Sequence, residues 1–145
     1  MQDLPKMRFA PHLGYRPPYD PLFQALVGSD DPLAHVEFAA AQGFAGVFDA
    51  GARRRTAGQQ AALGDAIARH GLEAGCVLYT GFANLKHPAW SQDTPTTRAW
   101  IDAELDEAIA TAQRLGSRRI AVLGGAQPDR PRLQQHRDFA QHLRR

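Results

Sequence analysis

The chain has 145 residues, of which 43% are apolar and 22% are charged, and its formal net charge is +2. This composition predicts one soluble globular domain that can bury an apolar core and need not be disordered. No apolar run reaches the roughly 18 residues of a membrane helix, and the N-terminal residues lack the apolar centre of a secretory signal, so we expect a cytoplasmic protein without a membrane partner.

The first predicted strand is the apolar run at residues 7–13. Asp31 is placed to cap a helix that starts at Pro32, and Gly43 is placed to end it. The next apolar run, at residues 44–48, predicts the second strand.

Arg53, Arg54 and Arg55 follow as the one dense basic run. A groove for single-stranded nucleic acid needs aromatic residues interleaved with its basic ones, and none occurs here. We therefore interpret the run as a solvated loop and expect no nucleic-acid partner. Thr56 and Gln59 then have the spacing of a capping box, which predicts a second helix.

Gly71 is expected to end this second helix, and residues 72–79 predict the third strand. This strand contains the only cysteine, Cys76, which has no internal disulfide partner and which we expect to be buried. The longest helix should start near Pro95 and end at Gly116.

The last predicted strand is at residues 119–123, and the last predicted helix is at residues 131–143. One face of this helix contains the following residues: Leu133, His136, Ala140 and Leu143. Strands that alternate with helices predict βαβ units and a parallel sheet, in either a doubly wound fold or a (β/α)₈ barrel. The turn at residues 12–19 contains no G-x-G-x-x-G sequence, which disfavours a dinucleotide-binding unit.

Three junctions resemble the xylose isomerase-like superfamily. Residues 39–47 resemble its junction between the first helix and the second strand, and residues 70–73 resemble the next junction. Residues 108–128 resemble the third helix and fourth strand of hydroxypyruvate isomerases. The resemblance implies an α/β fold with about four βα units of a (β/α)₈ TIM barrel, in which residues 1–145 form one N-terminal half-barrel domain.

Barrel enzymes place their reacting groups on the loops that follow the strands. The substrate-binding residues predicted on these loops are His12, Tyr15, Asp49, Asn84, Trp90 and Gly125. Several of them have a structural alternative. His12 is also consistent with a hydrogen-bonded loop histidine, Asp49 with an N-cap or a partner of Arg53, Trp90 with a loop anchor, and Gly125 with a tight turn.

The resemblance indicates the N-terminal half of an aldose–ketose isomerase or epimerase of the hydroxypyruvate isomerase type, acting on a small hydroxy-carbonyl or sugar substrate. Asp49 follows the second strand where those isomerases tend to have a glutamate. The first strand ends in Pro11-His12-Leu13-Gly14 where those isomerases look more like Asn-Leu-Ser, which leaves the substrate open. The resemblance also implies a divalent metal and catalytic carboxylates on strands five to eight. We therefore assign no catalytic residue, metal ligand or cofactor to this chain, and we expect it to be inactive alone.

Two alternatives remain open. One is a non-enzymatic half-barrel that dimerises and binds a small polyol or hydroxy acid, and the lower-ranked one is a relative of the abasic-site endonucleases. In every case a half-barrel leaves two strand edges unpaired, which predicts a homo-oligomer formed through these edges.

Overall fold

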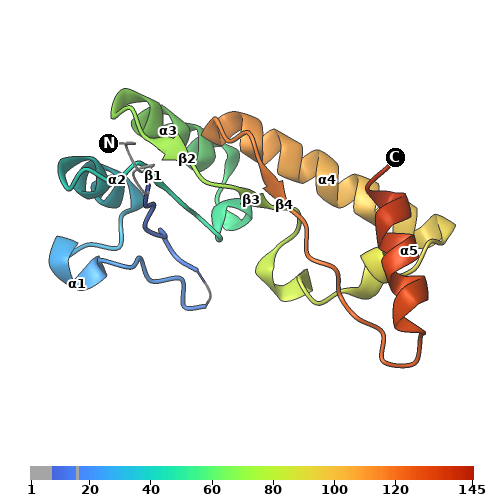
Figure 1. Ribbon diagram of the computed structural model, residues 1–145. Coiled ribbons are helices and arrows are strands. Elements are labelled where there is room, and N and C mark those ends of the chain that lie inside the picture. The colour runs from blue at the N-terminus through green and yellow to red at the C-terminus, as the bar shows by residue number, and fades with distance from the viewer. Residues whose placement is uncertain (1–7, 16) are drawn as a thin grey trace, which may run out of the picture.

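Four parallel strand segments follow one another in the computed structural model, which describes residues 8–15 and 17–145 (Figure 1). They are residues 8–13, 44–48, 72–79 and 119–123, called here the first to fourth segments. All four were predicted as strands, although Met7, the predicted start of the first, lies outside the described residues. The first segment meets the second through a parallel bridge between His12 and Phe48.

The remaining ladders are short and parallel. Strand β1 (Gly46–Val47) of the second segment pairs with β2 (Glu73–Ala74) in the first half of the third segment. Strand β3 (Val77–Leu78), in the second half of the third segment, pairs with β4 (Ile120–Ala121) of the fourth. The third segment thus contacts its earlier neighbour through its first half and its later neighbour through its second half. Such a stagger between neighbouring strands is required when strands tilt around a barrel.

Local capping explains the helices. In α2 (Pro32–Ala41) the Asp31 side chain accepts a hydrogen bond from the Leu33 N–H at 3.0 Å, and α3 (Ala57–Arg69) begins with the predicted capping box of Thr56 and Gln59. A second capping box, between Thr94 and Thr97, begins α4 (Pro95–Leu115). The predictions for these three helices are confirmed.

Short elements complete the chain. The last helix, α5 (Arg132–His142), lies within its predicted range. The sequence did not indicate the single-turn helix α1 (Gln24–Val27) or the 3₁₀ turns η1 (Ala52–Arg54), η2 (Phe82–Asn84) and η3 (Pro88–Ser91). No helix among residues 8–15 and 17–145 is both long and apolar enough to cross a membrane.

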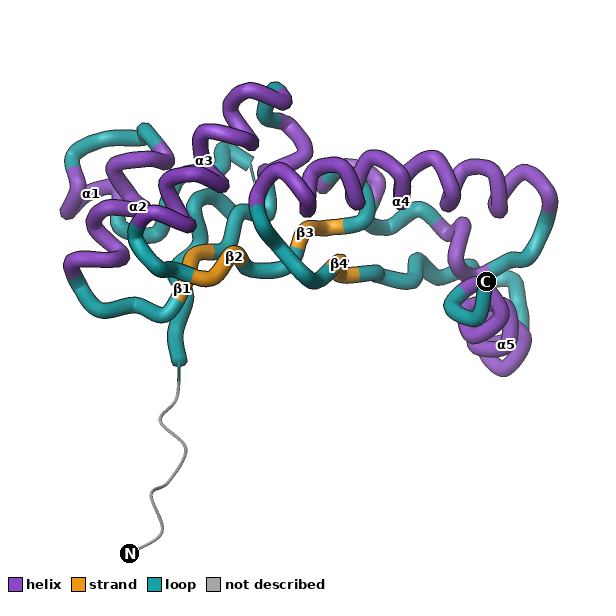
Figure 2. The backbone as a smooth tube through the Cα atoms, turned by 90° about the horizontal axis from the view of Figure 1, so that it is seen from above, coloured by secondary structure: helices purple, strands orange, loops and turns teal. Residues whose placement is uncertain are grey.

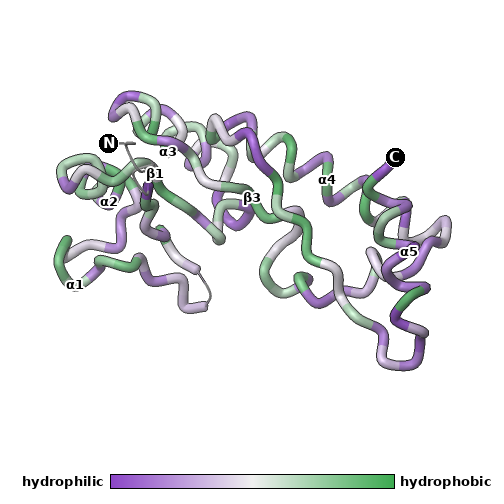
Figure 3. The backbone as a smooth tube through the Cα atoms, in the orientation of Figure 1, coloured by the Kyte–Doolittle hydropathy of each residue, from purple (hydrophilic) through white to green (hydrophobic). Residues whose placement is uncertain are grey.

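The helices α2, α3 and α4 lie on one side of the strands (Figure 2). Their buried apolar side chains form one core with Leu13, Val47 and Val77 of the strand segments. A second, smaller core contains Tyr79 and Trp90, with Phe139 of α5 packed against it. Figure 3 shows the chain changing from hydrophilic to hydrophobic as it enters β4. Cys76, expected to be buried, is half-buried.

Candidate functional site

Asp49, directly after the second segment, is held by two hydrogen bonds. One carboxylate oxygen accepts the Gly51 N–H at 2.9 Å and the other accepts the Arg55 Nε–H at 2.6 Å, and the residue is 8% exposed. The expected alternative partner, Arg53, is wrong, because Arg53 forms its ion pair with Glu104 of α4 instead. The 3₁₀ turn of η1 has about three residues per turn, so Arg53 and Arg55, which are two positions apart, point to different sides and reach different partners.

The basic run at residues 53–55 is therefore not simply a solvated loop. Arg53 and Arg55 are both half-buried in ion pairs, with Glu104 and Asp49 respectively. Arg54 is exposed, and its guanidinium carbon lies 3.9 Å from the centroid of the Tyr19 ring. Stacking on an aromatic face leaves the donor groups at the edge of a guanidinium free to bind an acceptor.

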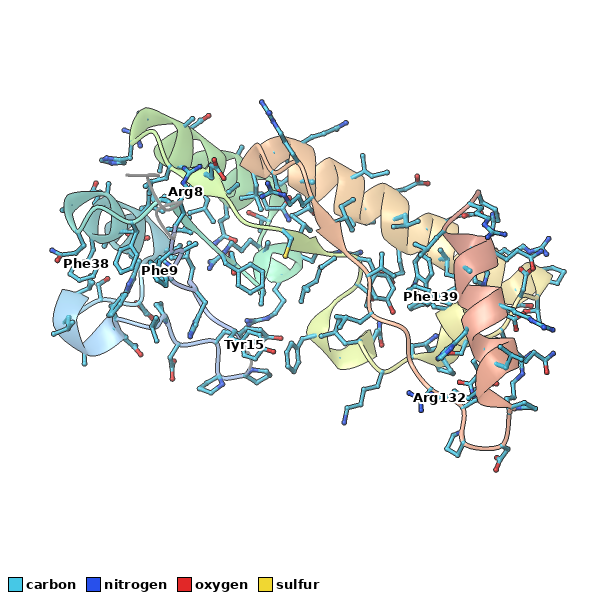
Figure 4. The ribbon with its side chains drawn as sticks, viewed as in Figure 1. Arg8, Phe9, Tyr15, Phe38, Arg132 and Phe139 are labelled. Carbon is cyan, nitrogen blue, oxygen red and sulfur yellow. The ribbon has the colours of Figure 1, made fainter. Side chains whose placement is uncertain are left out.

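Aromatic side chains connect the loops after the first and third segments. The Tyr15 ring centroid is 6.2 Å from that of His12 and 6.3 Å from that of Phe82 in η2, and Tyr19 is also edge-on to Phe82. Tyr15 is 54% exposed, and Figure 4 shows it at the tip of the first loop, on the side of η2. His12 Nδ1 accepts the Gly14 N–H at 3.3 Å, as expected for a hydrogen-bonded loop histidine.

A polar cavity of about 310 Å³ lies between the loops that follow the first and second segments. Leu13 and Gly51 form part of its wall, and the Tyr19 ring forms another part. Its charged and amide-bearing lining residues are Asp20, Asp30, Asp49, Arg54, Arg55 and Gln59. The cavity thus combines carboxylate acceptors with guanidinium and amide donors at the carboxyl ends of two strands.

Of the six predicted residues only Asp49 lines this cavity, and His12 and Tyr15 lie outside it. Asn84 is exposed in η2. Trp90 is 2% exposed, edge-on to Tyr79 with ring centroids 5.6 Å apart, and so anchors the loop after the third segment. A Cβ added to Gly125 would lie 2.5 Å from the carbonyl oxygens of Lys86 and His87, so this glycine allows two loops to pack closely.

Tyr79, at the end of the third segment, is fully buried. Burial and then the nearby Glu104 carboxylate raise the pKa of Tyr79 to about 12. Its carbonyl oxygen accepts a hydrogen bond from Arg53 at 2.6 Å, which fixes the position of the loop that bears Asp49. Tyr79 is therefore a structural support behind the cavity.

The residues described here do not fit the divalent metal that the resemblance implies. Asp20, Asp30 and Asp49 share the cavity, but within residues 8–15 and 17–145 no three His, Cys, Asp or Glu side chains lie close enough to bind one ion. Both carboxylate oxygens of Asp49 are already engaged by Gly51 and Arg55.

Sequence reasoning did not identify Tyr19, Asp20, Asp30 or Arg54 as parts of the site. Arg54 had a signal, because the basic run directly follows a predicted strand, where barrel folds place their binding groups. The sequence contained no comparable signal for Asp20 and Asp30, because the chain between them contains an irregular turn and α1, and neither was predicted.

Comparison with known proteins supports the fold. No family model and no curated protein matches the chain. A solved structure, the crystal structure of AP endonuclease, family 2 from Brucella melitensis, superposes with a TM-score of 0.67 at 17% sequence identity. The alignment covers 96% of this chain and 49% of that one, so the chain spans about half the length of its structural neighbour.

This likeness defines the class of fold. The chain has an α/β fold that forms part of a (β/α)₈ barrel, with about four βα units, as the sequence predicted. The four βα units correspond to the four strand segments and the helices α2, α3, α4 and α5 that follow them.

Proposed function

We propose that the chain is the N-terminal half of an aldose–ketose isomerase or epimerase of the hydroxypyruvate isomerase type, and that it binds a small hydroxy-carbonyl or sugar substrate. The observation that carries this proposal is the polar cavity beside Asp49. It lies at the carboxyl ends of the strands, where barrel folds bind their substrates, and its volume of about 310 Å³ suits a small molecule.

The lining of the cavity supports a polyhydroxylated ligand. Substrate hydroxyl groups donate hydrogen bonds to the carboxylates of Asp20 and Asp30, and a substrate carbonyl or carboxylate accepts them from Arg54. Arg54 is suited to this role because it is exposed and stacked on Tyr19, while Arg53 and Arg55 are occupied by Glu104 and Asp49.

Moving a proton between adjacent carbons needs a base and a polarised carbonyl. The described residues supply binding groups, and we propose that the acid–base groups and the divalent metal belong to the other half of a complete barrel. The chain alone then binds its ligand without turning it over. Turnover of hydroxypyruvate by this chain with an added divalent metal would contradict this division of roles.

Nuclear magnetic resonance titration tests the binding site. Hydroxypyruvate and a ketose are added in turn to the ¹⁵N-labelled chain, and we expect amide shifts at Gly51, Arg54 and Gln59. The variant Arg54→Gln should lose most of the affinity without breaking the Asp49–Arg55 pair. The control Arg69→Gln changes an exposed arginine of α3 and should leave binding unaltered. Shifts confined to residues outside the cavity would refute the assignment.

A second candidate function is an endonuclease of the abasic-site type, because the solved structural neighbour has that name. The charges near the cavity disfavour it, since Glu104 and Asp49 neutralise two of the three adjacent arginines. Binding to a DNA duplex with one abasic site, measured by fluorescence anisotropy at several salt concentrations, separates the candidates. Salt-dependent binding that prefers the abasic duplex would favour the endonuclease.

A further inference from the structure

The first segment has an outer hydrogen-bonding edge that is only partly occupied, because the His12 carbonyl on this edge accepts the Leu22 N–H at 3.1 Å. The carbonyl groups of Phe9 and Pro11 accept from Ala45 and Phe48, and the Leu13 N–H donates to the Phe48 carbonyl, so these alternate residues point to the second segment. In a parallel ladder the intervening residues, Ala10 and His12, direct their N–H groups to the opposite edge.

The fourth segment has a matching edge. Its Arg119 and Ala121 carbonyls accept from the Val77 and Tyr79 N–H groups, so Ile120 and Val122 direct their backbone groups away from the third segment. The spacing of two residues is the same as on the first segment. Pro11 lies at a position that faces the second segment, so its missing N–H does not interrupt the outer edge.

Exposed apolar side chains gather near the same two ends of the molecule. Near the first segment and α1 these residues are Phe9, Leu22 and Leu26, which are 53–74% exposed. Near the fourth segment and α5 they are Leu123, Leu133 and Leu143, which are 43–63% exposed. Figures 1 and 2 both show α1 and α5 at opposite ends of the chain fold.

The helix α5 is packed on only part of its apolar surface. Its Phe139 and His142 rings lie 5.5 and 5.7 Å from Trp90, whereas Leu133 and Leu143, on the face that the sequence pattern indicated, remain exposed. In a barrel each outer helix packs against two neighbouring strands, whereas α5 packs mainly against η3. The face of α5 with Leu133 and Leu143 is therefore available for a further contact.

We propose that a second copy of this chain closes the barrel, with the fourth segment of each copy pairing in parallel with the first segment of the other around a two-fold axis. The occupant is a second copy because each chain carries both complementary edges and apolar side chains at both ends, so one symmetric assembly covers all four ends at once. Two sets of four segments give the eight strands of a closed barrel.

This assembly closes the barrel for binding, but both halves are the same chain, so its described residues add none of the acid–base groups or metal ligands that the proposed isomerase reaction requires. Parallel pairing keeps the carboxyl ends of all eight strands on one side, so the two cavities beside Asp49 open toward a shared entrance. The pairing of the edges does not depend on the ligand, and a failure of ligand binding would leave the dimer in place.

Light scattering after size exclusion measures the assembly. We expect a mass of twice 15.9 kDa that persists on dilution. Leu133→Glu should shift the protein toward the monomer by at least tenfold in dissociation constant, because it places a charge in the seam. The matched control, Ile109→Glu, changes a residue of α4 that is 45% exposed and should leave the mass unchanged. Circular dichroism verifies that both variants are folded.

Disulfide cross-linking tests the pairing itself. In a Cys76→Ala background, the variant Ala10→Cys/Val122→Cys should form a covalent dimer on oxidation, whereas Ile109→Cys in the same background should not. A compact monomer at every concentration overturns the proposal and indicates that a different polypeptide supplies the second half. A dimer that resists Leu133→Glu and shows no cross-link between positions 10 and 122 also overturns it.

Discussion

Arg53 donates a hydrogen bond to the carbonyl oxygen of Tyr79 at 2.6 Å, and this contact joins the loop after the second segment to the end of the third. The same guanidinium group forms an ion pair with Glu104 of α4, with both side chains less than 20% exposed. One arginine therefore fixes two neighbouring strand ends to the helix that covers them. The cavity beside Asp49 depends on this support, since η1 carries both Arg53 and Arg54.

Replacing Arg53 by glutamine should lower the free energy of unfolding by about 2 kcal/mol or more, because it leaves the half-buried Glu104 carboxylate without its charged partner. The control is Arg8→Gln. The ion pair of Arg8 with Glu73 is 64% and 58% exposed, so its loss should cost less than about 1 kcal/mol. Urea denaturation followed by circular dichroism measures both, and equal losses would show that the Arg53 contacts are not stabilising.

Gly125 and Gly124 provide a second matched pair. A methyl group at Gly125 would collide with the backbone oxygens of Lys86 and His87, whereas one at Gly124 would meet the Phe139 ring at 3.1 Å. Backbone yields less readily than a side chain, so Gly125→Ala should destabilise the protein by about 1–3 kcal/mol and Gly124→Ala by less. Thermal unfolding gives the comparison. If both variants unfold alike, Gly125 is not needed for close packing of the loops.

The helices were predictable because their signals are local. Asp31 with Pro32, and Thr56 with Gln59, mark helix starts through contacts within three residues, and the structure contains those contacts. The strand segments were also found, since buried apolar runs between helices are typical of parallel sheets. The split of the third segment into β2 and β3 was not, because the register depends on the neighbouring strands.

The candidate site was predicted only in part. Asp49 was indicated by its position after a strand, but its partner was assigned to Arg53 instead of Arg55, because the choice depends on how η1 packs against α4. Trp90 was equally consistent with a pocket wall and a loop anchor, and its burial against Phe139 requires α5, which is about fifty positions further along the chain. Contacts at such separation leave no mark in a local pattern.

Tyr79 should make the stability of the protein depend on alkaline pH. Its pKa is raised from 10.0 to about 12, first by burial and then by Glu104. A tyrosine in the unfolded chain ionises near pH 10, so the unfolded state loses its proton first as the pH rises. The stabilisation is therefore complete below about pH 10 and is lost progressively between about pH 10 and pH 12.

Urea denaturation at several pH values across this range measures the loss. We expect the free energy of unfolding of the native sequence to fall by about 2 kcal/mol, and that of Tyr79→Phe to stay more nearly constant, because phenylalanine has no proton to lose. The control Tyr15→Phe changes a tyrosine that is 54% exposed and should retain the alkaline loss. An equal loss in Tyr79→Phe would assign the pH dependence to other groups and would show that the Tyr79 hydroxyl is accessible to solvent in the folded chain.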